Sequence, residues 1–346
     1  MTLTTNTDNP MIHTLTHTAS GTTCQIHELG ATVLSFTSRD QREWLFVSRD
    51  AVLDGQKAVR GGIPLAFPIF GPSPATSTMS QHGFARVNVW TVRDDADNNN
   101  NNDDDGSTFD TADSAGCTVT LDSDTVVAGR GTGNPWEHSN STTSSVKCKL
   151  TYQIEIAANY LKTVLTVTNT SSSNDLTFDV QALQHTYLRV DNHAAQQANE
   201  CWVQGLDGYT MADKVVAGGT TAVDGSSTAV LAANTDGSRV TLAGEVDRVY
   251  TPPATSDKMN ARVQIAVGGG QKLQLVATAV LQDKPQPVSI VVWNPGSEKA
   301  AAMSDFGSDQ YKDMICVEPG MLTSGVSLAV GQSAVLTQIL SKVMVE

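Results

Sequence analysis

The stretch LTYQIEI (150–156) decides the fold class, because every second residue in it is apolar. Successive side chains of a β-strand point to opposite faces, so the four apolar residues of this stretch would share one buried face. The same alternation recurs in 176–180 and 273–279, and VSIVVW (288–293) is typical of a buried strand. No long segment carries an apolar stripe with the helical period. The sequence therefore predicts an all-β protein, built as a large antiparallel β-sandwich or barrel.

The 346 residues are enough for one large β domain, and we expect a single domain over 1–346. Two segments look like insertions into it. The first, 94–116, contains the Asn/Asp block DDADNNNNNDDD, and the second is 129–145. Both lack the apolar residues that would offset the entropy of ordering, so we expect mobile surface loops.

The chain is acidic, with 22 Lys and Arg against 36 Asp and Glu and a formal net charge of −14. No run of Lys and Arg stands out. Nucleic acids and anionic membranes both bind clustered positive charge, so neither is expected as a partner. A small anion remains compatible with this balance, because local arginines would decide its binding.

The five cysteines are far apart and match no zinc site, so we expect reduced, structural thiols and no metal. The first twenty residues contain no Lys or Arg, and no apolar stretch approaches the ~18 residues of a membrane span. We expect a cytoplasmic protein. No dinucleotide fingerprint, Walker loop, GxSxG or HExxH is present, so no cofactor is expected.

What remains is a set of polar residues that stand in apolar or Gly- and Pro-rich surroundings. Such residues need a partner or a function when they are buried. The set consists of Arg60, Gln81, His82, Arg86, His185, Asp247 and Glu318.

Each of these residues also has a structural interpretation. A histidine such as His185 is more often a hydrogen-bonded core residue, and Arg60 or Arg86 alone is more often an ion-pair partner. Asp247 is compatible with a turn. Glu318 follows the apolar run MICV, which would draw its carboxylate close to the core. Taken singly, these signals are weak.

Seven segments together are specific. They are GATVLSF (30–36), RGGIPLAFPIFGP (60–72), QHGFAR (81–86), LQHTYLRV (183–190), DRVY (247–250), VVWNPG (291–296) and CVEPG (316–320). In this order they resemble the glucose-6-phosphate 1-epimerases, the hexose-6-phosphate mutarotases of the aldose 1-epimerase superfamily. The resemblance begins near residue 12 and runs to the C-terminus. One departure follows the WNP motif, where 293–307 does not continue with the usual aromatic residue.

The resemblance implies the galactose mutarotase-like supersandwich and, as substrate, a hexose 6-phosphate. It implies that His185 and Glu318 are the catalytic pair. It also implies that Arg60, Gln81 and Arg86 hold the sugar phosphate, that Asp247 binds the sugar, and that His82 lines the site. We expect a monomer without cofactor or metal.

Interconversion of anomers requires one base at the C1 hydroxyl and one acid at the ring oxygen, which exchange roles on ring closure. From reference values we expect Glu318 to be ionised and to act as the base. His185 would act as the acid if the phosphate and Glu318 raise its pKa. Arginines suit the phosphate, because their planar donors match its oxygens.

Three other functions remain open at this point. An aldose 1-epimerase for unphosphorylated sugars would not need Arg60 and Arg86. A sensor that binds a sugar phosphate would keep both arginines and would not need His185 with Glu318. A two-carboxylate glycosidase is disfavoured, because the matched pair is a histidine with a glutamate.

Overall fold

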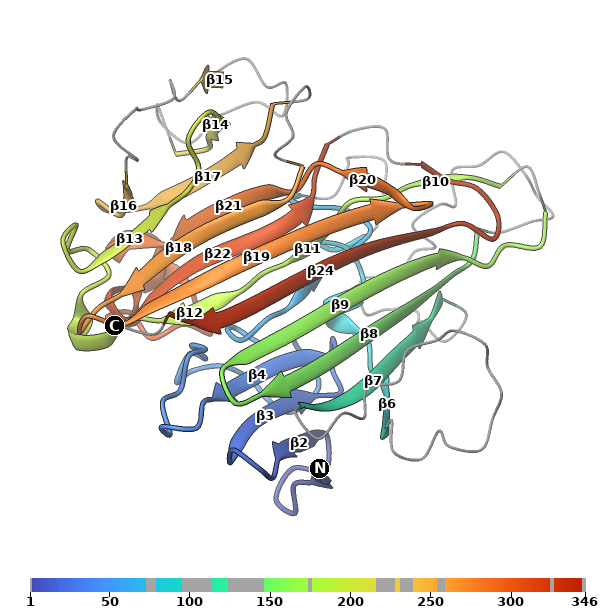
Figure 1. Ribbon diagram of the computed structural model, residues 1–346, viewed down its shortest axis with the longest axis horizontal. Coiled ribbons are helices and arrows are strands. Elements are labelled where there is room, and N and C mark those ends of the chain that lie inside the picture. Colours follow the sequence, from blue (N-terminus) through green and yellow to red (C-terminus); the bar gives the residue numbers. More distant parts are fainter. Residues whose placement is uncertain are drawn as a thin grey trace.

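A ten-stranded sheet crosses the whole molecule (Figure 1). The computed structural model describes residues 2–72, 79–94, 114–123, 146–173, 176–215, 228–230, 239–253, 259–323 and 327–343. Buried and half-buried residues alternate along the long strands of the ten-stranded sheet, as expected where one face packs on a core. In spatial order its strands are β16 (Val240–Thr241), β13 (Cys201–Gln204), β18 (Ala261–Val267), β19 (Lys272–Leu281), β24 (Ser333–Lys342), β9 (Tyr160–Asn169), β8 (Cys148–Ala157), β7 (Ser114–Asp122) and β6 (Thr91–Asp94), with β20 (Lys284–Gln286) paired to β19.

An eight-stranded sheet packs against the inner face of the larger one. Its central strands are buried on both faces, because one face meets the inter-sheet core and the other carries a second apolar cluster. Its strands are β15 (Thr228–Val230), β14 (Thr210–Asp213), β17 (Val246–Thr251), β21 (Ser289–Asn294), β22 (Met314–Met321), β11 (Ala182–Gln184) and β5 (Leu65–Ala66), with β12 (Tyr187–Arg189) paired to β22.

Smaller elements complete the described structure, and helices are few and short. The four-stranded sheet at the N-terminal end is drawn in blue in Figure 1. None of the helices in the described part of the chain has the length or apolar character that crossing a bilayer requires. The elements are β1 (Thr2–Thr5), β2 (Ile12–His17), β3 (Thr22–His27), β4 (Thr32–Thr37), the pair β10 (Phe178–Asp179) and β23 (Ser327–Leu328), the helix α1 (Gly296–Ala302), and the 3₁₀ turns η1 (Ala85–Val87), η4 (Asp191–His193) and η5 (Gln310–Asp313).

The prediction of large antiparallel sheets is confirmed, since every pairing between named strands here is antiparallel. The stretches 150–156 and 273–279 lie in β8 and β19, and 288–293 lies mostly in β21. The stretch 176–180 forms only the two-residue strand β10.

The boundary predicted for the first insertion, 94–116, is wrong at its C-terminal end. Residues 114–116 already belong to β7, where Ala115 packs into the core and its neighbours pair with β8. Residues 95–113 and the second insertion, 129–145, lie outside the described residues.

Candidate active site

Glu318 lies on β22, and the alternation of that strand decides which face its side chain occupies. Ile315 and Val317 pack into the inter-sheet core, whereas Cys316 joins the second apolar cluster on the opposite face. Glu318, two residues after Cys316, therefore faces the second cluster. Its side chain is only 1% exposed, and neither carboxyl oxygen has a hydrogen-bond partner among the described residues. Leaving a buried carboxyl group without donors is costly and is typical of a functional group.

His185 lies at a turn between β11 and β12. Its backbone N–H donates to the carbonyl of Pro64 (2.9 Å). The N–H of Val317 on β22 donates to the carbonyl of Thr186 (3.1 Å). This bond joins the turn to β22 beside Glu318, and Nδ1 of His185 lies 3.4 Å from Oε1 of Glu318. The two side chains predicted to be catalytic, 133 positions apart in the chain, are therefore neighbours.

Aromatic rings fix the plane of the His185 imidazole. The ring of Tyr187 stacks on it, with centroids 4.8 Å apart and an interplanar angle of 14°. Trp293 and His82 each meet it edge-on at 5.9 Å. Rings on three sides leave the imidazole little rotational freedom.

The surroundings push the pKa values of the pair in opposite directions. Burial lowers the pKa of His185 well below its usual value, and the nearby His82, Arg86 and Arg60 add to this effect. Burial also raises the pKa of Glu318 well above its usual value, and the charge of Asp247 adds to it. Burial therefore disfavours the charged form of both groups, the imidazolium of His185 and the carboxylate of Glu318.

The directions of both shifts run against the sequence-based expectation of an ionised Glu318 and a His185 with a raised pKa. That expectation used reference pKa values and the attraction of a neighbouring anion. Burial is the largest cause of both shifts, and it acts against the charged form of each group.

Arg60 lies beside this pair and is held by two partners. Its Nε donates to Oδ1 of Asp305 (3.2 Å), and its Nη1 donates to the hydroxyl of Tyr187 (3.3 Å). Burial alone would lower the pKa of Arg60, but Tyr187 and Asp305 outweigh burial and raise it. Arg60 is therefore a permanent cation at this position.

Lys57 contributes a second cation on the same loop. Its Nζ lies 2.8 Å from Oδ2 of Asp305, so this carboxylate bridges Lys57 and Arg60. Burial would raise the pKa of Asp305, but hydrogen bonds and charge from the two cations outweigh burial and lower it. Asp305 is therefore ionised and holds both cations in place.

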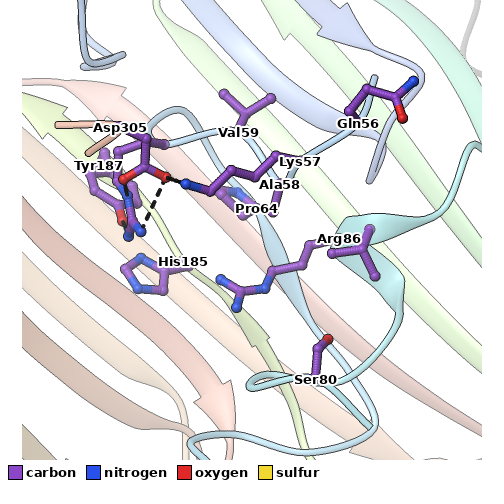
Figure 2. Close-up of a pocket in the computed structure, with 12 residues that line it drawn as sticks. Gln56, Lys57, Ala58, Val59, Pro64, Ser80, Arg86, His185, Tyr187 and Asp305 are labelled. Atoms are coloured by element: carbon purple, nitrogen blue, oxygen red, sulfur yellow. Dashed lines mark hydrogen bonds and ion pairs between the residues drawn. The ribbon is translucent and has the colours of Figure 1, made fainter. Parts of the chain in front are cut away.

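Arg86 supplies a third cation, and Figure 2 shows its guanidinium extending toward His185. Its Nη2 donates to the carbonyl of Gln81 (2.7 Å). Burial, together with the charge of Arg60, lowers the pKa of Arg86 to about 10, so it is charged at neutral pH. Lys57, Arg60, Arg86 and His185 line one cavity of about 470 Å³, which Asp305 and Tyr187 also border.

Gln81 and His82 belong to the same segment but do not line this cavity. The Nδ1 of His82 accepts the N–H of Gly71 (3.1 Å), and Gln81 Nε2 lies 3.3 Å from His82 Nε2. Burial, with help from Arg86 and other cations, lowers the pKa of His82 to about 3. His82 is therefore a neutral ring packed on His185, and Gln81 is linked to the cavity through its carbonyl bond to Arg86.

Asp247 lies on β17, in register with Trp293 on β21. Its Oδ1 is 3.8 Å from Nζ of Lys214, which sits over the ring of Phe70. Burial raises the pKa of Asp247, and Lys214 opposes this. Asp247 is not among the residues that line the cavity, and it lies near enough to Glu318 to influence the pKa of that residue.

Lys57, Tyr187 and Asp305 were not singled out from the sequence. Two of them had a signal: Lys57 precedes Arg60 by three residues, and Tyr187 follows His185 by two. Asp305 falls in the segment after WNP that departs from the resemblance, so the sequence offered no signal for it.

One group of side chains in the described part of the chain has the spacing to hold a metal ion. The ligand atoms of His185, Cys316 and Glu318 lie within 4.8 Å of one another. Acid–base transfer of a proton requires only an acid and a base, so chemistry of that kind at these side chains would not need an ion.

The aldose 1-epimerase family profile matches residues 11–341, which is nearly the whole chain. The protein belongs to the aldose 1-epimerase family. It is thus an isomerase that interconverts anomers, and the resemblance noted in its motifs is confirmed.

Curated relatives of this protein are identical to it at about a quarter of the aligned positions. A protein of Cenchrus ciliaris named "Putative glucose-6-phosphate 1-epimerase" is 27% identical over 311 residues, which cover 89% of this chain and 78% of the relative. A protein of Escherichia coli K12 with the same name is 26% identical over 292 residues, covering 84% and 76%.

Solved structures agree on the fold. A "putative mutarotase" (YeaD) of Salmonella typhimurium superposes with a TM-score of 0.66 at 21% identity, covering 98% of this chain and 92% of that one. A galactose mutarotase-like protein of Clostridium acetobutylicum gives a TM-score of 0.59 at 12% identity, covering 96% and 95%. The galactose mutarotase-like fold predicted from the motifs is confirmed.

Proposed function

We propose that this epimerase acts on hexose 6-phosphates, with His185 and Glu318 as the catalytic pair and Lys57, Arg60 and Arg86 as the phosphate site. The observation that carries the proposal is the charge of the cavity beside the pair. Three cations against the single carboxylate of Asp305 leave two net positive charges. A phosphomonoester carries about −1.5 to −2 charges, which matches this excess. An unphosphorylated sugar would leave these two net positive charges without a counterion.

At the other end of the sugar, the pair supplies one proton and one group that can accept a proton. Ring opening moves a proton from the C1 hydroxyl to a base and delivers another to the ring oxygen. Neutral His185 is the base and protonated Glu318 is the acid when the reaction starts from the free protein. After ring opening the proton lies on His185, rotation about C1–C2 follows, and reclosure on the other face returns each proton.

Because the pair holds one proton throughout, it serves both directions equally, as a reaction that interconverts two anomers requires. Asp247 and Lys214 lie on the Glu318 side, where they bind sugar hydroxyls in this proposal. Gln81 and His82 act on the phosphate side through their contacts with Arg86 and His185.

The test is NMR exchange between the α and β anomers, with glucose 6-phosphate and glucose compared at equal concentration. We expect fast exchange of the phosphorylated sugar, abolished by His185→Ala and by Glu318→Gln. Arg60→Met should raise KM for glucose 6-phosphate at least tenfold and raise KM for glucose far less. Arg189→Met, an exposed arginine on β12, is the matched control.

Two results would redirect the proposal. Equal kcat/KM for both sugars would indicate an aldose 1-epimerase without phosphate preference. Tight binding of glucose 6-phosphate with exchange at the solvent rate would indicate a sensor.

We also propose that the protein works as a monomer in the cytoplasm. Among the described residues only one large apolar side chain, Val89, is exposed, which offers a partner no apolar patch. The five cysteines are buried and form no disulfide, as is usual in a reducing compartment. Sedimentation of the purified chain tests whether the protein is a monomer.

A further inference from the structure

A group of polar side chains is buried in the inter-sheet core, directly behind the candidate active site. Each of its members has an exposed fraction of 0%, and the residues around them are apolar. We call this group the inter-sheet network. Its members are Tyr152 on β8, Thr163 on β9, Gln184 on β11, Thr186 after β11 and Gln338 on β24.

Gln184 is the centre of this network. Its Oε1 accepts hydrogen bonds from the hydroxyls of Tyr152 (3.1 Å) and Thr163 (2.6 Å). Its Nε2 donates to the carbonyl of Leu336 on β24 (3.2 Å). The strands β8, β9 and β24 lie side by side in the large sheet (Figure 1), so Gln184 is tied to three of its strands at once.

Thr186 extends the network on the other side of His185. Its hydroxyl donates to Oε1 of Gln338 (2.8 Å), and Nε2 of Gln338 lies 3.4 Å from Oε1 of Gln184. The two residues are also joined through the backbone, because the N–H of Thr186 donates to the carbonyl of Gln184 (2.9 Å). That bond makes His185 the central residue of a three-residue turn.

The neighbours of His185 therefore point into the core while His185 points into the site. His185 and Thr186 lie between β11 and β12, where no neighbouring strand of the described structure pairs with them in a regular ladder. The side chains of Gln184 and Thr186 supply that restraint from behind, and the bond from Val317 to the Thr186 carbonyl links the turn to β22.

Stability alone does not account for these residues. Burial of amides and hydroxyls is unfavourable unless every group is paired, and apolar residues of the same size would fill the space without that requirement. A fully paired buried network does restrict the backbone to one arrangement.

We infer that the inter-sheet network is a positioning device for His185, which holds the turn at the place where the imidazole meets Glu318. The members of the network are positioning residues, because none of them is placed on the face that carries the site. The inference rests on the proposed catalytic role of His185.

The main test replaces the network by apolar side chains of similar size, in the triple variant Thr163→Val, Gln184→Met and Gln338→Met. Removing partners together leaves few unpaired groups, so we expect the variant to fold. We expect kcat to fall about 10- to 100-fold, because a displacement near 1 Å at a catalytic group costs up to that factor. KM for glucose 6-phosphate should stay within about threefold.

Two single variants keep the test informative if the triple variant does not fold. Tyr152→Phe and Thr186→Val each remove one hydroxyl and little volume, and each should lower kcat by a smaller factor without changing KM. Thr337→Val is the matched control, since Thr337 neighbours Gln338 on β24 but lies on the outer face.

The NMR signals of the His185 imidazole provide a readout that needs no substrate. We expect the ring signals to shift and broaden in Thr186→Val and to stay unchanged in Thr337→Val. Wild-type kcat together with unchanged imidazole signals in the network variants would overturn the inference. Failure of the proposed function looks different, since the wild-type protein itself would then not exchange glucose 6-phosphate.

Discussion

The Nδ1 atom of His185 lies 3.4 Å from Oε1 of Glu318, and neither atom has a hydrogen-bond partner among the described residues. Glu318 is buried, with 1% of its side chain exposed, and His185 is partly exposed, at 14%. A histidine and a carboxyl group at this distance share one proton most easily when neither carries a net charge, because charge is poorly solvated there. In the proposed reaction, such a pair would move a proton without first being recharged by solvent.

The first prediction concerns the protonation of His185. At pH 6.5 an unperturbed histidine is half protonated, but burial and the charges of Arg86 and Arg60 lower the pKa of His185. We therefore expect its imidazole to be neutral at pH 6.5 in the free protein. Nitrogen-15 NMR of histidine-labelled protein measures this, with His185→Gln to assign the signals. An imidazolium signal at that pH would contradict the prediction.

The second prediction concerns stability, and Glu318→Gln should increase it at neutral pH. The pKa of Glu318 is raised in the folded protein, so its contribution is fully present below the unfolded value of about 4.3 and is lost as pH rises toward the folded value. Each unit of difference corresponds to about 1.4 kcal/mol. Glutamine mimics the protonated group and does not titrate.

The measurement is the melting temperature of both proteins between pH 4 and pH 8. We expect equal values near pH 4 and a growing advantage of Glu318→Gln above it. Glu298→Gln is the control, because Glu298 is exposed on α1 and should show no such trend. If the melting temperature of the wild-type protein rose relative to that of the variant as pH increases, the raised pKa of Glu318 would be disproved.

The third prediction assigns Lys57 to recognition of the phosphate. Its Nζ is held by Asp305 at the cavity, 50% of its side chain is exposed, and a bound phosphate would compete for the same donor. A hydrogen bond to a charged group contributes about 1.5–3 kcal/mol, so Lys57→Met should raise KM for glucose 6-phosphate roughly 10- to 150-fold. Exchange of unphosphorylated glucose should not change.

Lys299→Met is the matched control for this experiment. Lys299 also pairs with a carboxylate, Glu245, at 2.8 Å, but it lies on α1 and does not line the cavity. A parallel loss with both sugars in Lys57→Met would show that the lysine supports the fold of its loop and not the phosphate.

Local patterns in the sequence were sufficient for the strands that pack one face on a core. The alternation in 150–156 and 273–279 predicted β8 and β19, because burial on one face imposes that period. The same alternation at 176–180 led to only two paired residues. Phe178 and Val180 are both buried, but only Phe178 and Asp179 have a neighbouring strand to pair with. Burial can be inferred from the local sequence, whereas the partner strand cannot.

The candidate site was predictable where its residues carry local signals. Glu318 follows an apolar run that continues through a central strand, and the QHGFAR and RGGIP segments place Arg86 and Arg60. Asp305 was not predictable, because it meets Arg60 across 245 positions of the chain. The directions of the pKa shifts of the pair were not predictable, since desolvation depends on packing and no reference pKa contains it.

The last prediction tests how the loop that carries Arg86 is held. Gly83 has φ +77°, and a Cβ there would meet the carbonyl oxygen of Phe67 at 2.0 Å, which backbone atoms cannot tolerate. The N–H of Phe84 donates to that same carbonyl (2.9 Å), so Gly83→Ala must separate the two segments. Since Arg86 is on the displaced loop, we expect a loss of stability of several kcal/mol together with a higher KM for glucose 6-phosphate.

Gly270→Ala separates the two causes of that loss. Gly270 has φ +70°, but a Cβ added there would meet no atom within 4 Å, so alanine carries only the backbone strain of about 1–2 kcal/mol. Denaturant unfolding of both variants measures the difference, and exchange kinetics measures KM. If Gly83→Ala were no more destabilising than Gly270→Ala, the contact between Gly83 and Phe67 would not be what holds the loop of Arg86 at the cavity.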